Sequence, residues 1–392
     1  MADVYVVSAC RTPFGRFGGA FRDLSAVELG AVAVREAIAR SGLAPEAVEE
    51  AVLGNCMGAA SLGQVPGRQV ALRAGLSPAA TVLDVNTACT SSLVSVGLAF
   101  DRIRHGQAGA IVAGGFESMS QVPYALPGAR FGYRLGNAPI VDALISALTC
   151  PVTHVHMGIY AGRAAVAAGI DRAAQDRWAL GSQLRYEAAR AAGTVAEEVV
   201  PVTIPSPKGA VTVGSDEQPR PDTTYDKLAA LPPAFEAGGT VTAGNAPGLN
   251  DGAAALVLVD GETVRAQGLL PLARIVAAGR AGAPPPEINS VPALAAQAAL
   301  QGAGLDVHDI DLWEINEAFA AVPLTCIAEL GLDPGRVNVN GGAVAIGHPV
   351  GATGARILMV LVFELRRRGG GRGVATLCGA GANGCAVVVE VP

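Results

Sequence analysis

The sequence repeats itself at an offset of about 262 residues, and this repeat limits the folds open to the chain. The stretch VREAIARSGLAPEAVEEAVLGNC has an amphipathic helical pattern, a stop at Gly42-Leu43, a short acidic linker and an apolar strand. The stretch AAQAALQGAGLDVHDIDLWEINEAF has the same order, with its stop at Gly304-Leu305. Further on, AGAIVAGGFESM is matched by GVATLCGAGANG, a strand that enters a glycine-rich turn. Two similar α/β units predict a pseudo-twofold core with a site where the halves meet.

Composition excludes several classes of function for this chain of 392 residues. The formal net charge of −6 argues against nucleic acid as a main partner. No apolar stretch reaches the length of a transmembrane helix, no basic run suggests a membrane surface, and the N-terminus lacks a signal-peptide pattern. We therefore expect a cytoplasmic protein without a membrane partner.

The seven cysteines have no paired spacing, which favours reduced thiols over a disulfide framework, and no clustered Cys/His pattern suggests a metal site. Most of them are expected to be buried and structural: Cys10, Cys56, Cys150, Cys326 and Cys385.

The segment from about 121 to 248 differs in composition from both repeats. Proline, glycine and polar residues predominate in it, although GIDRAAQDRWALGSQLRYEAARAAG is typical of ordered helices. A long irregular segment between two structured units is usually functional. We therefore interpret it as a functional insertion rather than a linker.

Cys89 is the first candidate for chemistry. In LDVNTACTSSLVSVGLAFDRIRHG an apolar strand through Val82 and Val85 precedes it, and a helix is predicted from about 91 to 105. The free amides and the dipole of a helix N-terminus favour a thiolate there. The same amides are able to hold an oxyanion. Taken alone, the segment also fits a buried structural cysteine.

Three further residues stand at turns between predicted strands and helices. His348 lies between Gly347 and Pro349, in a rigid turn before a helix predicted over 352–368. Cys378 ends the strand VATLC and opens GAGANG, where small residues let a substrate approach the backbone. Asn316 in WEINEAFA fits either a residue that orients water or a helix cap. Two thiols and one histidine suit the making or breaking of a carbon–carbon bond beside a thioester.

With these motifs, the chain resembles the thiolase family over nearly its whole length. The matching blocks are the Cys89 segment, GNAPGLNDGAAA, NEAFA, GGAVAIGHPVGATGAR and the Cys378 turn. The resemblance implies an α/β fold of two duplicated βαβαβαββ halves, packed as a layered α/β/α/β/α core, plus a loop domain. The implied boundaries are 1–120 for the N-terminal half (completed by about 249–270), 121–248 for a loop domain that binds CoA, and 271–392 for the C-terminal half.

The resemblance also implies a reaction, the reversible condensation of two acetyl-CoA molecules to acetoacetyl-CoA and CoA. Cys89 would carry the acyl group after His348 takes its proton, and Cys378 would remove the α-proton of the second acetyl-CoA. The enolate oxygen would be held by His348 and a water on Asn316, and the oxyanion by the backbone amides of Cys89 and Ala380. No permanently bound cofactor and no metal is expected.

The same resemblance gives the loop domain the role of binding CoA and implies a CoA and acyl tunnel. Arg220 would contact the nucleotide end, where a cation suits adenine and phosphates. The tunnel residues implied by matching position are Leu148, His156, Met157, Arg220, Leu231, Ala234, Phe235, Ala243, Pro247, Leu249, Ala318 and Phe319. The expected partners are acetyl-CoA, CoA, 3-ketoacyl-CoA and other copies of the chain, as a dimer or a dimer of dimers.

Some motifs depart from the family pattern. Pro247 stands where many members have serine, and the final turn reads Ala380-Gly381-Ala382-Asn383 where glycines are usual. These changes leave acyl-chain preference open, so a 3-ketoacyl-CoA thiolase of β-oxidation with broader chain length is an alternative. A ketoacyl synthase is a further rival, which Cys378 argues against. A non-catalytic thiolase-like subunit is a remote one, because Cys89, His348 and Cys378 are all present.

Overall fold

The first half of the chain builds one side of a mixed sheet. The computed structural model describes residues 1–57, 63–205 and 209–392. The strands of this half lie in the order β4-β3-β5-β10-β1, with β3 parallel to both β4 and β5, and β10 antiparallel between β5 and β1. Their bounds are β1 (Val4–Arg11), β3 (Glu50–Gly54), β4 (Thr81–Val85), β5 (Ala110–Ser118) and β10 (Asn250–Asp260), and β2 (Gly15–Arg16) pairs with the start of β10.

The second half repeats this arrangement. Its strands lie in the order β12-β13-β14-β11, and Val337 pairs in parallel with Trp313 of β12, at the place that β4 has beside β3. Their bounds are β11 (Ala273–Gly282), β12 (Leu312–Ile315), β13 (Gly371–Gly379) and β14 (Asn383–Val391). Val4 of β1 pairs with Ile275 of β11, so the two halves form one ten-stranded sheet within the described residues. The duplication predicted from the sequence is confirmed.

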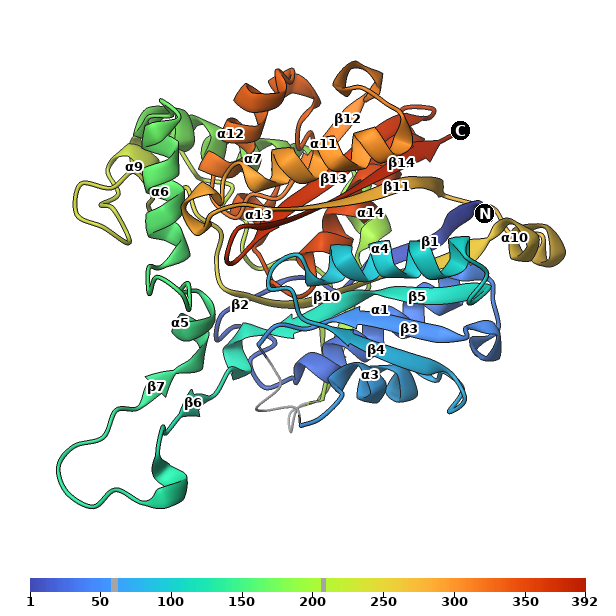
Figure 1. Ribbon diagram of the computed structural model, residues 1–392, viewed down its shortest axis with the longest axis horizontal. Helices are drawn as coiled ribbons and strands as arrows, with labels where there is room; N and C mark the ends of the chain where they lie inside the picture. Colours follow the sequence, from blue (N-terminus) through green and yellow to red (C-terminus); the bar gives the residue numbers. More distant parts are fainter. Residues whose placement is uncertain (58–62, 206–208) are drawn as a thin grey trace.

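The helices make the remaining layers (Figure 1). On the outer face of the first half lie α1 (Ala26–Ser41) and α3 (Pro66–Ala74), and on that of the second lie α11 (Val291–Ala303) and α12 (Ala321–Leu330). Between the halves, α4 (Ser91–Arg104) and α14 (Thr353–Arg367) pack against each other and against strands of both. This central layer forms the largest apolar core, and the predicted α/β/α/β/α order is confirmed.

Local sequence signals explain where the matched helices begin and end. Ser25 caps α1 in a capping box with Glu28, and α1 ends at Gly42 in the left-handed region, φ 78°. The counterpart α11 ends at Gly304 with φ 68°. Both predicted stops are confirmed. In the described part of the chain, no helix is both long enough and apolar enough to cross a lipid bilayer.

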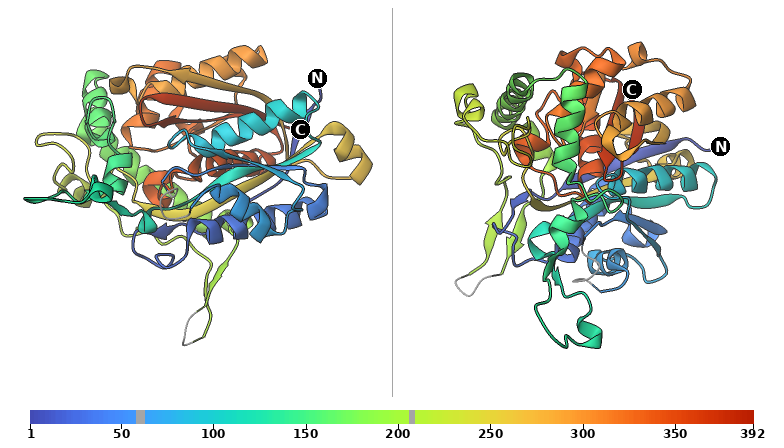
Figure 2. Two further views of the ribbon diagram at one scale, coloured as in Figure 1. Left: turned by 60° about the horizontal axis from the view of Figure 1, so that its bottom comes forward. Right: turned by 60° about the vertical axis from the view of Figure 1, so that its left-hand side comes forward.

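The segment between β5 and β10 folds as one long helix and several short elements around the edge of the core (Figure 2). The hairpin β6 (Tyr124–Ala125) and β7 (Val141–Asp142) projects from the body, as does the hairpin β8 (Val202–Ile204) and β9 (Val211–Val213). The stretch predicted to be helical is a single long helix, α7 (Arg172–Ala191). Helices α8 (Thr194–Glu198) and α9 (Tyr225–Ala229) contact α7. The other two helices of the segment are α5 (Ala143–Ala147), which contacts β6 and β7, and α6 (Met157–Ala167).

The helix α6 packs against α12, and α7 packs against α12 and the short α13 (Ala343–Ile346). These helices of the insertion therefore pack against the second half of the chain. The remaining helix, α10 (Gly261–Gln267), follows β10 on the surface. The 3₁₀ turns are η1 (Pro45–Ala47), η2 (Met119–Gln121), η3 (Ala129–Phe131), η4 (Pro285–Glu287), η5 (Val307–Asp309) and η6 (Pro334–Arg336).

Candidate active site

The four predicted catalytic residues come from both halves, at the ends of equivalent elements. Cys89 lies between β4 and α4, and His348 lies just before α14, the counterpart of α4. Cys378 is near the end of β13, and Asn316 directly follows β12. Because parallel strands present their carboxyl ends at one edge of a sheet, these side chains converge where α4 and α14 begin.

Cys89, His348 and Cys378 share one cavity of about 870 Å³. Its walls come from both halves and from the insertion, which contributes Leu148, Met157 and Phe235 among others. Asn316 is 1% exposed and stands behind His348 rather than in the wall, with its Nδ2 3.5 Å from His348 Nε2. The structure therefore brings together the catalytic set predicted from separate motifs.

The turn that carries Cys89 is strained and tightly bonded. Ala88 adopts φ 55°, a backbone conformation that residues other than glycine rarely take. Residues in such conformations cluster at functional sites. Ser91 Oγ donates a hydrogen bond to Ala88 O at 2.6 Å and accepts one from the Thr87 amide at 2.9 Å. Cys56 Sγ also donates to Ala88 O, at 2.9 Å. These bonds hold the nucleophile turn in place.

The Cys89 thiol is neutral before substrate binds. Burial raises its pKa to about 12, and the charge of Glu117 also raises it, whereas hydrogen bonds from the backbone amides of Cys89 and Ala380 lower it. The backbone amides do favour the thiolate, as expected from the sequence, but desolvation outweighs them and the net pKa is raised. The two amides do face the sulfur, as an oxyanion at the acyl carbon requires.

Cys378 is 1% exposed, and burial raises its pKa well above the ordinary value for a thiol. A thiolate at Cys89, which lines the same cavity, would raise the pKa of Cys378 further. Either thiolate disfavours the other, so ionisation of one sulfur is coupled to the protonation of its neighbour.

His348 is also neutral, and it is held from three sides. Burial, and secondarily the charge of Arg356, lowers its pKa to about 3. Its backbone amide donates to Asn250 Oδ1 at 3.0 Å, and its Nδ1 lies 2.7 Å from Thr353 Oγ1. Asn316 Oδ1 is buried and has no hydrogen-bond partner among the described residues, which leaves it able to accept a hydrogen bond from a water.

The predicted CoA and acyl residues line this cavity with one exception. Leu148, His156, Met157, Arg220, Ala234, Phe235, Ala243, Pro247, Leu249, Ala318 and Phe319 are all in its wall. The His156 and Phe235 rings are stacked with centroids 4.5 Å apart, and Phe235 meets Phe319 edge-on at 6.1 Å. Leu231 is a correction: it packs against Ala179, Leu228 and Val344, away from the cavity.

Sequence reasoning missed several residues of the site. Cys56, interpreted as structural, lines the cavity and bonds the nucleophile turn. Glu117, Asn250 and Thr353 went unnoticed although they are buried polar residues in contact with the site. The signal available for Thr353 was its place five residues after His348, at the first turn of a predicted helix. Within the described residues, no group of three or more His, Cys, Asp or Glu side chains could hold a metal.

Comparison with known proteins agrees with this geometry. The family model described as the thiolase N-terminal domain matches residues 4–262, and that of the thiolase C-terminal domain matches residues 269–391. The chain belongs to the thiolase family. This thiolase is 46% identical to an acetyl-CoA acetyltransferase of Cupriavidus necator, with 100% of both chains covered. It is 42% identical to the beta-ketothiolase BktB of the same organism, with 99% of each chain covered.

A solved structure gives the same answer for the fold. The crystal structure of the Bacillus anthracis acetyl-CoA acetyltransferase superposes with a TM-score of 0.98 at 41% identity, covering 100% of this chain and 99% of the other.

Proposed function

We propose that this thiolase catalyses the reversible condensation of two acetyl-CoA molecules to acetoacetyl-CoA and CoA, through an acyl group on Cys89. One observation carries the proposal: two thiols and a neutral histidine meet in a single cavity with two backbone amides aimed at one of the sulfurs. The names of the similar acetyl-CoA acetyltransferases support the acetyl substrate.

The first half-reaction is a transfer of acetyl to Cys89. His348 Nε2 takes the thiol proton as the sulfur attacks the thioester carbonyl, and the amides of Cys89 and Ala380 hold the oxyanion. The carbon–sulfur bond to CoA then breaks, and Cys378 gives its proton to the leaving CoA thiolate. Acetyl-Cys89, an imidazolium and a Cys378 thiolate remain, so the protons balance.

The second half-reaction uses the Cys378 thiolate that the first one made. Cys378 removes a methyl proton from the second acetyl-CoA, and the enolate oxygen accepts hydrogen bonds from His348 and from a water on Asn316 Oδ1. The carbanion attacks acetyl-Cys89, forming the new carbon–carbon bond and releasing the Cys89 thiolate. That thiolate recovers its proton from the imidazolium. Thiolysis of a 3-ketoacyl-CoA is the same sequence in reverse.

We assign residues 121–248 to a loop domain that binds CoA, between halves that span 1–120 (completed by about 249–270) and 271–392. The stacked His156 and Phe235 rings and the aliphatic Leu148 and Met157 offer an apolar wall for the pantetheine arm. Arg220 adds a cation for phosphate or adenine. The reacting groups are protein side chains and backbone amides, with CoA thioesters as substrates.

Longer acyl chains are the alternative within the same chemistry. The cavity wall beside Cys89 includes Met57, Met119 and Val350, whose side chains are apolar and, for methionine, adaptable. Similarity to a human mitochondrial 3-ketoacyl-CoA thiolase, at 40% identity and TM-score 0.96, also supports this alternative. Thiolysis rates for 3-ketoacyl-CoAs from four carbons upward separate the two: a steep fall beyond four carbons supports the acetyl assignment.

We also propose that the protein works in the cytoplasm as a dimer or a dimer of dimers. The described cysteines are all free thiols, which fits a reducing compartment. The projecting β6–β7 hairpin exposes large apolar side chains, including Phe131 and Leu135, and such patches mark protein contacts.

The central test is intact-mass analysis after exposure to acetyl-CoA. Wild-type protein should gain one acetyl group, and Cys378→Ala should gain one more slowly, because CoA must then leave without the proton of Cys378. Cys89→Ser should gain none, because a serine hydroxyl is a far weaker nucleophile than a thiol. Cys378→Ala should also fail to exchange the methyl protons of acetyl-CoA for deuterium. An acetyl adduct on Cys89→Ser, or exchange at the wild-type rate in Cys378→Ala, would contradict the assigned roles. Activity that needs a malonyl thioester would instead indicate a ketoacyl synthase.

A further inference from the structure

We propose that Thr353 is a positioning residue that fixes the His348 imidazole in the tautomer with its hydrogen on Nδ1, so that Nε2 alone exchanges protons with the reacting groups. The proposal rests on the proposed function, in which His348 is the base for Cys89. Thr353 is the first residue of α14 and is fully buried. It lies outside the cavity wall and therefore acts through His348.

The two contacts of the Thr353 hydroxyl determine its orientation. Oγ1 lies 2.9 Å from Pro349 O and 2.7 Å from His348 Nδ1. A carbonyl oxygen can only accept, and a hydroxyl has one hydrogen, so both contacts are hydrogen bonds only if the hydroxyl donates to Pro349 O. The lone pair of Oγ1 then faces Nδ1, which must carry a hydrogen.

The other side of the ring agrees with this assignment. Nε2 faces Asn316 Nδ2 at 3.5 Å, and an amide nitrogen can only donate. A hydrogen on Nε2 would set two donors against each other in a buried place, whereas a lone pair on Nε2 is compatible with its neighbour. The Thr353 contact therefore sets the hydrogen on Nδ1, and a lone pair on Nε2 of the neutral ring fits the Asn316 amide as it lies in the structure.

The backbone beneath the ring is fixed independently of Thr353. The His348 amide donates to Asn250 Oδ1, and Asn250 Nδ2 donates to Gly15 O at 2.9 Å. Gly347 has φ 101°, and a Cβ there would lie 2.3 Å from Asn250. Asn250 thus places the His348 backbone, and the remaining freedom is rotation of the side chain and choice of tautomer, which the Thr353 hydrogen bond removes.

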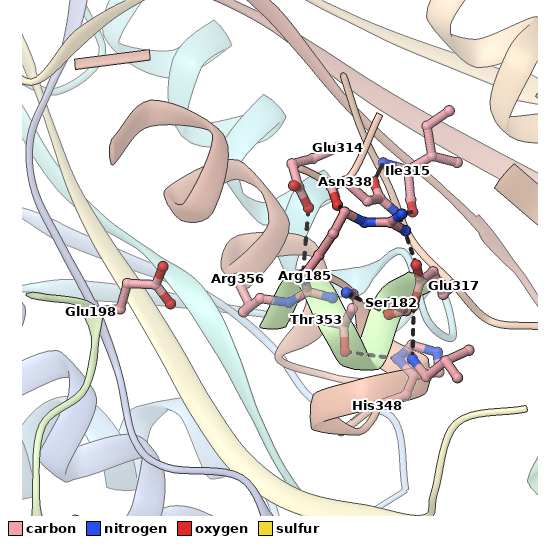
Figure 3. A network of polar contacts seen from close by, with 12 residues as sticks. Ser182, Arg185, Glu198, Glu314, Ile315, Glu317, Asn338, His348, Thr353 and Arg356 are labelled. Carbon is pink, nitrogen blue, oxygen red and sulfur yellow. Dashed lines mark hydrogen bonds and ion pairs between the residues drawn. The ribbon is translucent and has the colours of Figure 1, made fainter. Parts of the chain in front are cut away.

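One hydrogen bond serves both protonation states of the base. In the neutral ring and in the imidazolium, Nδ1 carries a hydrogen that Thr353 accepts, so the hydroxyl need not rotate when Nε2 gains or loses its proton. Figure 3 shows this contact, with Arg356 further along α14 directed toward Glu314 rather than toward the ring. Arg356 acts on His348 through its charge, and Thr353 acts by direct contact.

Nitrogen-15 NMR on the intact protein, labelled in histidine, tests the tautomer directly. His348 is assigned by the signals that vanish in His348→Asn. We expect a protonated, pyrrole-type resonance for Nδ1 and an unprotonated, pyridine-type resonance for Nε2. The reverse pattern in the wild-type protein would overturn the proposal. This readout does not depend on turnover, so a protein without thiolase activity would contradict the proposed function while the resonances still decide on Thr353.

A set of variants tests the kinetic consequence. Thr353→Val keeps the shape of the side chain but leaves the Nδ1 hydrogen without an acceptor. We expect kcat to fall about 100-fold, the lower end of what a positioned base contributes. KM for acetyl-CoA should change little, because Thr353 does not line the cavity. Thr353→Ser should restore most of the activity and the wild-type nitrogen resonances.

The matched control is Thr325→Val on α12. Thr325 is also buried, with 2% of its surface exposed, and its hydroxyl donates to the carbonyl four residues back, Ala321 O at 2.9 Å, as that of Thr353 donates to Pro349 O. It should show the general cost of losing such a hydroxyl without the loss of kcat. Equal kcat in folded Thr353→Val and Thr325→Val would overturn the proposal. If Thr353→Val does not fold, the wild-type resonances and the Ser variant still decide it.

Discussion

At the level of single residues, desolvation sets the resting state of the site. Burial raises the pKa of the thiols of Cys89 and Cys378 and lowers that of His348, so all three are neutral together. Proton transfer from Cys89 to His348 becomes favourable only when a thioester is bound. The negative charge then passes to the carbonyl oxygen, which the amides of Cys89 and Ala380 stabilise. Charge separation is thus coupled to substrate binding.

The pH dependence of alkylation tests this resting state. With the pKa of Cys89 raised to about 12, its thiolate fraction should grow about tenfold for each pH unit between 7 and 10, with no plateau. We expect the rate of iodoacetamide labelling at Cys89, followed by peptide mass analysis, to rise in the same way. Cys89→Ser supplies the background from the other thiols. A plateau near neutral pH would show a resting thiolate–imidazolium pair instead.

Pro247 is a second residue whose effect can be separated from the chemistry. It lines the cavity wall and, as proline, offers neither a hydroxyl nor a backbone donor to CoA. Pro247→Ser should lower KM for CoA with little change in kcat, by about two- to twelve-fold for a hydrogen bond of roughly 0.5–1.5 kcal/mol. The exposed Pro232, outside the cavity wall, provides the control Pro232→Ser. A collapse of kcat would show that Pro247 shapes the catalytic loops.

At the level of elements, the ends of β3 and β5 are tied together by a buried carboxylate. Glu117 of β5 accepts hydrogen bonds from the Cys56 amide at 3.0 Å and from Asn55 Nδ2 at 3.1 Å, just beyond β3. Burial raises its pKa to about 7, against the lowering effect of these donors. Its carboxyl group therefore couples proton uptake to the packing of the nucleophile turn, which Cys56 contacts.

This coupling predicts a pH-dependent stability. Because the folded pKa of Glu117 is raised from 4.5 to about 7, folding takes up a proton, and this contribution to stability falls as pH rises through that window. The loss amounts to about 3 kcal/mol. The lowered pKa of His348 has the opposite effect, because its contribution to stability rises with pH up to about 6.5. The effect of Glu117 is therefore isolated by comparing the wild type with a variant that lacks only this carboxyl group. Relative to Glu117→Gln, the wild-type free energy of unfolding by urea should fall between pH 5 and pH 8; a pH-independent difference would contradict the assignment.

The elements were more predictable from the sequence than the contacts between them. The matched helices α1 and α11 end at the predicted glycines because capping is local chemistry read along the chain. The Thr353–His348 contact depends on how the turn at Pro349 brings a helix to a side chain, which no periodicity encodes. Cys56 meets the nucleophile turn only because β3 and β4 are neighbours in the sheet. The prediction that Leu231 lines the tunnel was wrong, because a position in a family motif does not determine which way a loop side chain packs.

At the level of the whole molecule, the projecting hairpin is the clearest surface for assembly. Phe131 is 89% and Leu135 100% exposed in the loop between β6 and β7. We expect these side chains to be buried against other copies in the proposed dimer of dimers. Phe131→Glu combined with Leu135→Glu should halve the mass measured by analytical ultracentrifugation, while retaining the acetyl transfer to Cys89. The matched control is Leu270→Glu, at a residue 85% exposed after α10. An unchanged mass in the hairpin variant would show that the hairpin does not take part in assembly.

The position of β10 in the sheet has a consequence for biosynthesis. It hydrogen-bonds β1 on one side and β5 on the other, yet it follows β5 only after residues 119–249. A ribosome adding about 5–20 residues each second leaves the facing edges of β1 and β5 open for roughly ten seconds. We expect stalled nascent chains to resist protease in the first half only once residue 260 has left the exit tunnel. Until then, the apolar residues of β5 are accessible to chaperones or to another nascent copy of the chain.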